Sequence, residues 1–161
     1  MELTHVDETG RPRMVDVSAK EITERVAVAS GFIAVSTDAL ELLQAGANRK
    51  GDVLSVAELA GVMGAKKTAE LIPLCHPIAV EDMEVAATVS ENPPGVEVRA
   101  TARATAKTGV EMEALVAVSV ALLTVYDMMK SAGHRMVIGE IKLLEKTGGV
   151  RGDWFADPRE G

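Results

Sequence analysis

The long apolar segment in the second half of the chain ends with two residues that could exchange protons. Asp127 and Lys130 are three residues apart, so in a helix they share one face. A carboxylate in the last turn opposes the helix dipole at a cost of about 0.3–1 kcal/mol. It also follows a run that should be buried, and Lys130 is the nearest group that could compensate it. The spacing fits a structural ion pair and an acid–base pair equally well.

Other cationic side chains stand beside predicted turns and helix starts. Lys50, in Arg49-Lys50-Gly51-Asp52, precedes a helix whose free amides would favour an anion. Lys66 belongs to a lysine pair that also fits a solvated helix face. Lys107 and Lys146 each begin a Lys-Thr-Gly turn, but neither turn has the residue order of a Walker loop. Each of these is a weak signal for phosphate binding when it is taken alone.

Few residues suit metal binding or nucleophilic catalysis. His76 lies between two prolines, where a histidine can be a satisfied core residue or a ligand. A lone buried cysteine such as Cys75 is more often inert packing than a nucleophile. No metal site is predicted, because the three histidines and the cysteine are scattered, at His5, Cys75, His76 and His134.

The composition narrows the class of partner. The net charge of −7 disfavours a nucleic-acid groove or an anionic membrane surface, so any phosphate site must be local. A single cysteine excludes an internal disulfide and fits a reducing compartment, and no basic, apolar leader opens the chain. The apolar stretch 114–126 is shorter than the roughly 20 residues that span a bilayer, so we expect a buried helix. These features predict a cytoplasmic protein with no membrane or nucleic-acid partner.

The periodicity predicts four strands and three helical segments in one domain. We expect an arm at 1–13 and a C-terminal tail at 154–161. A Thr108–Glu111 capping box should open the long helix, where capping and dipole effects account for Glu111 and Glu113. Gly61 and Gly64 suggest a break in the second helical segment. The expected strands are 26–36, 78–89, 96–106 and 136–145, and the expected helices are 37–45, 52–72 and 108–131.

This order predicts an α+β, ferredoxin-like fold. An antiparallel sheet of about four strands would carry its helices on one face. The other face would need cover, and we expect its side chains to be small and apolar. They would suit another subunit, so a homo-oligomer with a site shared between chains is expected.

Several segments, in this order, resemble the cyclic pyranopterin monophosphate synthase family of molybdenum cofactor biosynthesis. The resemblance extends from about Leu3 to Asp153, and the tail from Trp154 lies outside it. The segments are Met14-Val15-Asp16-Val17-Ser18, Lys50-Gly51-Asp52, Leu71-Ile72-Pro73-Leu74-Cys75-His76-Pro77, Lys107-Thr108-Gly109-Val110-Glu111-Met112-Glu113-Ala114-Leu115, Tyr126-Asp127-Met128 and Lys146-Thr147-Gly148-Gly149.

The resemblance implies a lyase that acts on a GTP-derived substrate. The family converts 3′,8-cyclo-7,8-dihydroguanosine 5′-triphosphate into the pterin product, cyclic pyranopterin monophosphate, and releases pyrophosphate. It implies no redox cofactor, and the sequence does not indicate whether a divalent cation accompanies the triphosphate. It also implies a ferredoxin-like fold and a homohexamer, a trimer of dimers with sites at dimer interfaces.

The resemblance also implies roles for individual residues. Asp127 matches the catalytic aspartate, and Lys50 and Lys130 match lysines needed for turnover. Our hypothesis is that the two lysines act as acid and base while Asp127 positions and tunes them. A neighbouring carboxylate and lysine could depress the pKa of the lysine or share protons. The positions that match substrate-binding residues are Leu74, Cys75, His76, Met112, Glu113, Arg25, Lys66 and Lys146.

Two other readings of the sequence stay open. One is a nucleotide-sensing oligomer without catalysis, which the same fold would permit. The other is a structural interaction protein with no affinity for guanine triphosphate derivatives. Release of pyrophosphate from the cyclised substrate separates the enzyme from both.

Overall fold

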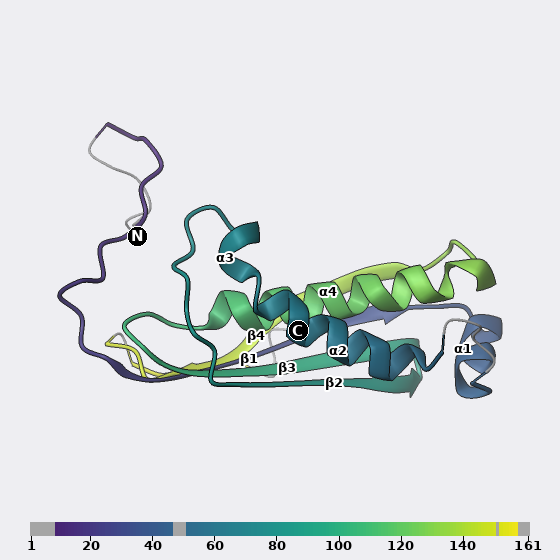
Figure 1. The fold of residues 1–161 in the computed structure, drawn as a ribbon. Helices are drawn as coiled ribbons and strands as arrows, with labels where there is room; N and C mark the ends of the chain where they lie inside the picture. The colour runs from purple at the N-terminus through teal and green to yellow at the C-terminus, as the bar shows by residue number, and fades with distance from the viewer. Residues whose placement is uncertain (1–8, 47–50, 151, 158–161) are drawn as a thin grey trace.

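An antiparallel sheet of five strands forms one layer of the molecule (Figure 1). The computed structural model describes residues 9–46, 51–150 and 152–157. Its strands follow the order β2-β3-β1-β4-β5 across the sheet, which is the ferredoxin-like order with one added edge strand. The strands are β1 (Thr23–Ala34), β2 (Asp82–Glu91), β3 (Pro94–Ala106), β4 (Val137–Thr147) and β5 (Trp154–Phe155).

The two longest helices cover one face of this sheet, as predicted (Figure 1). Ser36 caps the first helix, because its side chain accepts a hydrogen bond from the amide of Ala39. Asp52 caps the second helix through the amide of Leu54 in the same way. The helices are α1 (Thr37–Gln44), α2 (Val53–Ala65), α3 (Thr68–Leu71) and α4 (Glu111–Met129), and a 3₁₀ turn, η1 (Lys130–Ala132), continues α4.

Small side chains fill the space between sheet and helices. On β3, alternate residues face the helices and are fully buried, and Ala100 and Ala102 pair with Ala29 and Ala27 of β1. Alanine at these positions lets α4 lie close to the sheet. The buried residues of α4 on the other side of this core are Ala114, Val116, Ala117, Val118, Ala121, Leu122, Val125, Met128 and Met129.

The second helical segment differs from its prediction. It divides into α2 and α3 at Lys66 and Lys67 rather than at the glycines. Gly61 and Gly64 lie inside α2, where each faces α4: a Cβ on Gly64 would stand 2.7 Å from a methyl of Val120. The glycines therefore permit close packing of the two helices and do not break α2.

The predicted capping box at the start of α4 was wrong. The N-cap position is Val110, and no side chain caps it. The side chain of Glu111 instead accepts a hydrogen bond from Lys146 at the end of β4. A partner distant in sequence thus replaces the local capping pattern.

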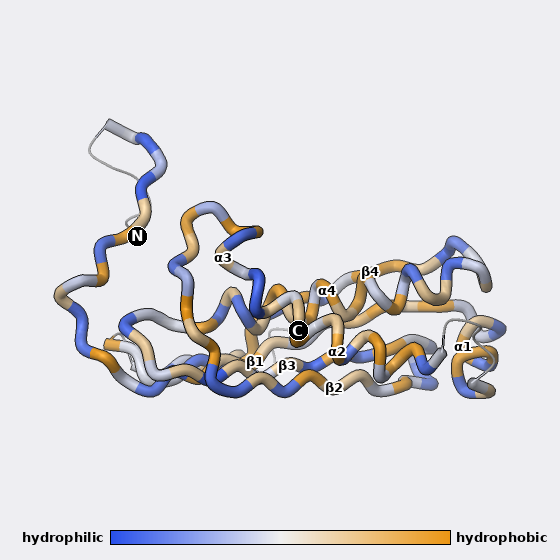
Figure 2. The backbone as a smooth tube through the Cα atoms, in the orientation of Figure 1, coloured by the Kyte–Doolittle hydropathy of each residue, from blue (hydrophilic) through white to orange (hydrophobic). Residues whose placement is uncertain are grey.

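The open face of the sheet agrees with the prediction only in part: on β1 it carries the apolar Val26, Val28 and Phe32, whereas on β3 it is polar. The residues of β3 that point away from the helices are polar rather than small and apolar: Glu97, Arg99, Thr101, Arg103 and Thr105. Side chains alternate between the two faces of a strand, and the alanines occupy the positions that face the helices. Exposed apolar side chains occur on α2 and α4, along which Figure 2 shows hydrophobic residues recurring, and also on β4 and β5, at Val137, Ile141, Trp154 and Phe155.

One helical stretch among the described residues, Glu111–Ala132, is long and apolar enough to cross a membrane by length and composition. It is longer than the apolar run counted in the sequence. More than half of its most apolar window is buried inside the protein, where it packs against the sheet and α2. This burial is typical of a core helix, as the sequence predicted.

Candidate active site

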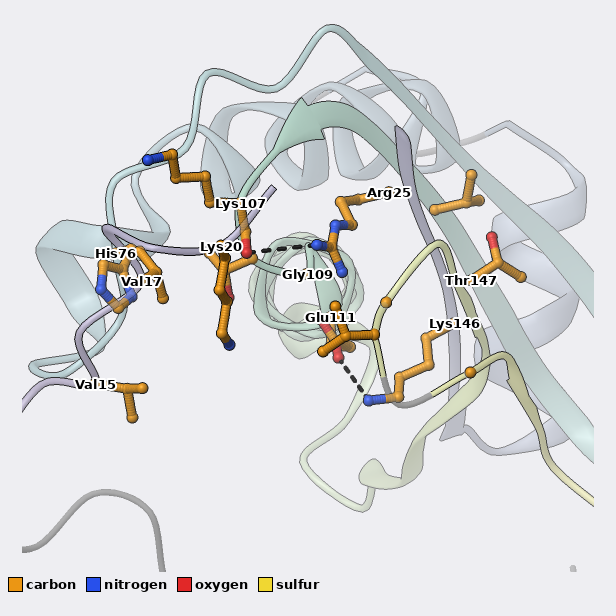
Figure 3. A pocket seen from close by; sticks show the side chains of 15 residues that line it. Val15, Val17, Lys20, Arg25, His76, Lys107, Gly109, Glu111, Lys146 and Thr147 are labelled. Atoms are coloured by element: carbon orange, nitrogen blue, oxygen red, sulfur yellow. Dashed lines mark hydrogen bonds and ion pairs between the residues drawn. The ribbon is translucent and has the colours of Figure 1, made fainter. Parts of the chain in front are cut away.

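A cavity of about 280 Å³ opens at the N-terminal end of α4 (Figure 3). It collects residues from the segment before β1, the start of β1, the β3–α4 turn, and the end of β4 with the loop that follows. These parts are far apart in sequence and meet because β1 lies between β3 and β4. Three of the predicted substrate-binding residues, Arg25, His76 and Lys146, line this cavity together.

Arg25 is the most deeply placed cation of the cavity. Only 6% of the residue is exposed. Its guanidinium donates hydrogen bonds to the carbonyl oxygens of Ala106 (3.2 Å) and Lys107 (3.4 Å). Within the described part of the chain no carboxylate pairs with it, so its charge is balanced by carbonyl dipoles alone. A buried cation in this setting favours an anionic ligand.

The turns around Arg25 need glycine. Gly148 has a φ of +83°, and a Cβ there would collide with the carbonyl of Glu24. A Cβ on Gly149 would stand 3.1 Å from Nη1 of Arg25. The two glycines of the Lys-Thr-Gly-Gly turn therefore let the chain pass directly over the guanidinium.

Lys146 is held at the cavity by a carboxylate. Its Nζ donates to Oε1 of Glu111 at 3.2 Å, and both side chains are partly buried. Figure 3 shows this pair beside Arg25, with Lys20 opposite. Glu111 is the only carboxylate among the described residues that line the cavity, while Lys20, Arg25, Lys107 and Lys146 all line it. The cavity is therefore cationic although the chain as a whole is acidic.

A second cavity, of about 320 Å³, lies on the other side of the start of α4. Two more predicted substrate-binding residues, Lys66 and Glu113, line it. Glu113 is 2% exposed, and its Oε2 is buried without a hydrogen-bond partner among the described residues. Burial raises the pKa of Glu113 above its ordinary value. A ligand that donates a hydrogen bond to this carboxyl would satisfy it.

Cys75 lies near Glu113 of the second cavity and Glu111 of the first, close enough for both charges to act on its thiol. Burial, followed by the nearby charges of Glu113 and Glu111, raises the pKa of its thiol. The thiol is thus kept in its protonated form, which agrees with the reading of Cys75 as packing rather than as a nucleophile. Leu74 and Met112 adjoin Cys75 and Glu113 in the chain and are partly exposed.

Asp127 and Lys130 form the predicted pair, with Lys130 Nζ 2.7 Å from Asp127 Oδ1. Both side chains are more than half exposed. The hydrogen bond to Asp127 and then its charge raise the pKa of Lys130. The expectation that the carboxylate could depress this pKa is therefore wrong for the single chain, because an adjacent negative charge favours the ammonium form.

The structure does not bring this pair to the cavities. The pair lies at the C-terminal end of α4, whereas Glu111 and Glu113 lie at its N-terminal end. Sixteen residues separate Glu111 from Asp127, which is about 24 Å along a helix at 1.5 Å per residue. No side chain spans that length within one copy. Lys50, the third predicted catalytic residue, lies outside the described residues.

The predicted site residues did not include Lys20, Lys107 or Glu111, although Lys107 was noted as a weak phosphate signal and Glu111 as a helix-start residue. All three line the first cavity, and Lys107 Nζ also donates to the carbonyl oxygen of Ser18 at 2.6 Å. The signal that could have found Lys20 is its place two residues after the segment Met14–Ser18, which the resemblance singled out without giving it a role. No group of three or more His, Cys, Asp or Glu residues within 9–46, 51–150 and 152–157 could hold a metal ion.

Comparisons with known proteins agree with this arrangement. The model of the MoaC family matches residues 14–149. Curated relatives named cyclic pyranopterin monophosphate synthase occur in Brucella ovis, Brucella melitensis and Brucella abortus. Each is 51% identical to this chain over 157 residues, which is 97% of this chain and 95% of the relative.

Proposed function

This chain belongs to the MoaC family, and from that premise we propose that it is a cyclic pyranopterin monophosphate synthase. The reaction is that of a lyase in molybdenum cofactor biosynthesis: it converts 3′,8-cyclo-7,8-dihydroguanosine 5′-triphosphate into cyclic pyranopterin monophosphate. The products include pyrophosphate, so negative charge builds on the leaving oxygens.

The observation that carries the proposal is the cationic cavity around Arg25. Expulsion of pyrophosphate is favoured by cations fixed in place before the reaction, because no reorganisation is then needed in the transition state. Arg25 is fixed by two carbonyl oxygens and Lys146 by Glu111. We assign the triphosphate to this cavity, with His76 helping to hold the substrate.

The second cavity suits the base-derived ring. A guanine-type edge carries N–H donors, and the buried Oε2 of Glu113 is an acceptor without a partner among the described residues. Lys66 lines the same cavity. A ring held at Glu113 would lie beside Leu74, Cys75 and Met112, the remaining predicted binding residues.

For proton transfer we assign Lys130 as the donor. Its pKa is raised by Asp127, so it carries its proton at neutral pH, and Asp127 holds the ammonium in place. Lys50, which the resemblance matches to a lysine needed for turnover, would then be left as the acceptor. Several proton transfers are needed, because ring opening and water addition accompany the rebuilding of the purine-derived ring.

A second copy of the chain would bring the donor to the cavities. The outward side of α4 carries a stripe of residues with helical spacing, which we call the α4 stripe: Met112, Leu115, Ser119, Leu123, Asp127 and Lys130. Its middle is apolar, since Leu123 is 60% exposed and the hydroxyl of Ser119 donates to its own helix at Leu115. The neighbouring α2 adds the exposed Val56, Leu59 and Met63.

The α4 stripe fits a two-fold pairing of antiparallel helices. Residues 112 and 127 are equidistant from the point between Ser119 and Val120. Two α4 helices that cross there would set Asp127 and Lys130 of one copy beside Met112 of the other, and hence beside its two cavities. The small Ser119 would permit close approach at the crossing.

The other properties follow the family resemblance. We propose a homohexamer of three such dimers, a location in the cytoplasm, and catalysis without a redox cofactor. The proposal includes no resident metal; a divalent ion would arrive, if at all, with the triphosphate.

Turnover of the cyclised substrate tests the proposal. Purified protein should release pyrophosphate and form the pterin product, and Asp127→Ala should abolish both while the oligomer stays intact. Unimpaired turnover by Asp127→Ala would remove Asp127 from the mechanism. Binding of the substrate without release of pyrophosphate would favour a sensor, and a titration without binding of any guanine triphosphate derivative would favour a structural protein.

A further inference from the structure

Residues 14–20, which we call the strap, cross the first cavity just before β1 begins. Val15, Val17 and Lys20 of the strap line the cavity, and Figure 3 shows the side chain of Lys20 between His76 and Glu111. The strap contains no helix or strand. The family resemblance marks most of this segment, yet nothing above gives it a role.

The strap keeps its own shape through short-range hydrogen bonds. The amide of Ser18 donates to Oδ1 of Asp16 at 2.8 Å, and the amide of Lys20 donates to the carbonyl of Val17 at 3.1 Å. These two bonds form consecutive turns that direct Lys20 toward the cavity. They do not tie the strap to the rest of the protein.

Lys107 supplies the long-range attachment. It lies on the β3–α4 turn, 89 residues from Ser18, and its ammonium donates to the Ser18 carbonyl at 2.6 Å. The neighbouring carbonyl group of Lys107 itself accepts from Arg25. A chain of hydrogen bonds therefore links the strap to Lys107, and Lys107 to the buried Arg25, around one side of the cavity.

Lys20 differs from the other three cations of the cavity. Arg25, Lys107 and Lys146 each donate to an acceptor of the protein. The ammonium of Lys20 has no hydrogen bond or ion pair to any residue in the described part of the chain. Within the described part of the chain, Lys20 is thus the one of these four cations whose hydrogen-bond donors are all left for a ligand.

We propose that the strap closes on the phosphate groups of the ligand, with Lys20 as a direct phosphate contact and Lys107 as the anchor that holds the strap in place. The ligand class is a di- or triphosphate, because Arg25, Lys146 and Lys20 line one cavity and offer three cations to the charges of several phosphate groups. The location of the phosphates rests on the proposed function, but the closure itself requires only a polyphosphate.

Titration with inorganic pyrophosphate tests the strap without turnover. Calorimetry should show that Lys20→Met weakens binding at least about tenfold, the loss of one charge-assisted contact. Lys142→Met is the matched control: Lys142 is an exposed lysine of β4, opposite Ser30 on the open face of the sheet, and its loss should leave affinity unchanged.

Hydrogen exchange distinguishes closure of the strap from electrostatic attraction of pyrophosphate that leaves the strap unchanged. In the wild-type protein, saturating pyrophosphate should slow exchange of the amides in residues 14–20. Lys107→Met should exchange faster there without ligand, and Lys20→Met should lose the protection that the ligand confers. Equal affinity and equal protection in Lys20→Met and wild type would overturn the proposal.

The outcome is separable from that of the proposed function. If the wild-type protein forms the pterin product but pyrophosphate does not protect the strap amides, the proposed function stands and the closure of the strap is refuted. If the protein binds pyrophosphate with protection of the strap but forms no pterin, the strap stands as part of a polyphosphate site and the synthase assignment is refuted.

Discussion

Two inactive variants should restore activity to each other if the site is shared between copies. We choose Asp127→Asn, which removes the carboxylate at the far end of α4, and His76→Ala, which alters the cavity at the near end. Each variant alone should lose about 100- to 10,000-fold in kcat if its residue takes part in proton transfer, and less if it only binds substrate. Neither change touches the buried core.

The expected recovery of activity follows from the length of α4 and from the fraction of mixed dimers. About 24 Å separates Asp127 from Glu111, so the two halves of a site come from different copies. When equal amounts of the variants exchange subunits, half of the dimers contain one chain of each kind. In such a dimer one site receives both defects and the other receives none, so activity should recover to about one quarter of the wild-type value.

The assay is pterin formation after the two variants are unfolded and refolded together. The matched control mixes Asp127→Asn with Lys130→Ala, whose residues lie 2.7 Å apart on the same half-site. Every site in that mixture keeps one defect, so no recovery is expected. If the Asp127→Asn and His76→Ala mixture shows only the mean of its two parents, the site is not shared and the proposed pairing of α4 helices is refuted.

Three further outcomes follow from the packing and the pKa shifts. Because burial raises the pKa of Glu113, the folded state keeps this proton to higher pH than the unfolded state, and the associated stability is present below the ordinary pKa of 4.5 and lost as pH rises through the folded pKa. The melting temperature of Glu113→Gln minus that of wild type should therefore rise between pH 4 and pH 8. A difference that stays constant with pH would contradict the burial of a desolvated carboxyl at this position. Gly64→Leu should lower the free energy of unfolding in urea by about 1–3 kcal/mol through its collision with Val120, whereas Met63→Leu, at the exposed neighbouring position, should change it little. Because burial raises the pKa of Cys75, Cys75→Ala should keep pterin formation within about tenfold of wild type, and a loss as large as that of a covalent nucleophile, beyond about a thousandfold, would reverse this reading.

Local patterns in the sequence predicted local features well. The spacing of Asp127 and Lys130 predicted their contact, because residues three apart in a helix must lie on the same face. The alternation of β2 and β3 was read correctly for the same reason, because it depends on residues a few positions apart. The order of these elements was enough to predict the ferredoxin-like sheet.

Patterns that depend on distant partners were read wrongly or missed. Glu111 looked like half of a capping box, yet its partner is Lys146, 35 residues away. Gly61 and Gly64 looked like a helix break, yet they are where α2 meets α4. The alternation on β3 was visible, but which of its two faces the helices would cover was not, so the polar side chains that β3 presents on the open face were not expected.

The sequence by itself determined the order of the elements, the residue types available for chemistry and the membership of the family. These depend on local periodicity and on identity at successive positions. Only the tertiary structure decided which charges meet. It gathered Lys20, Arg25, Lys107 and Lys146 from four segments into one cavity, because β1 lies between β3 and β4. It also set Asp127 and Lys130 a helix length away from that cavity, because α4 runs unbroken from Glu111 to Met129.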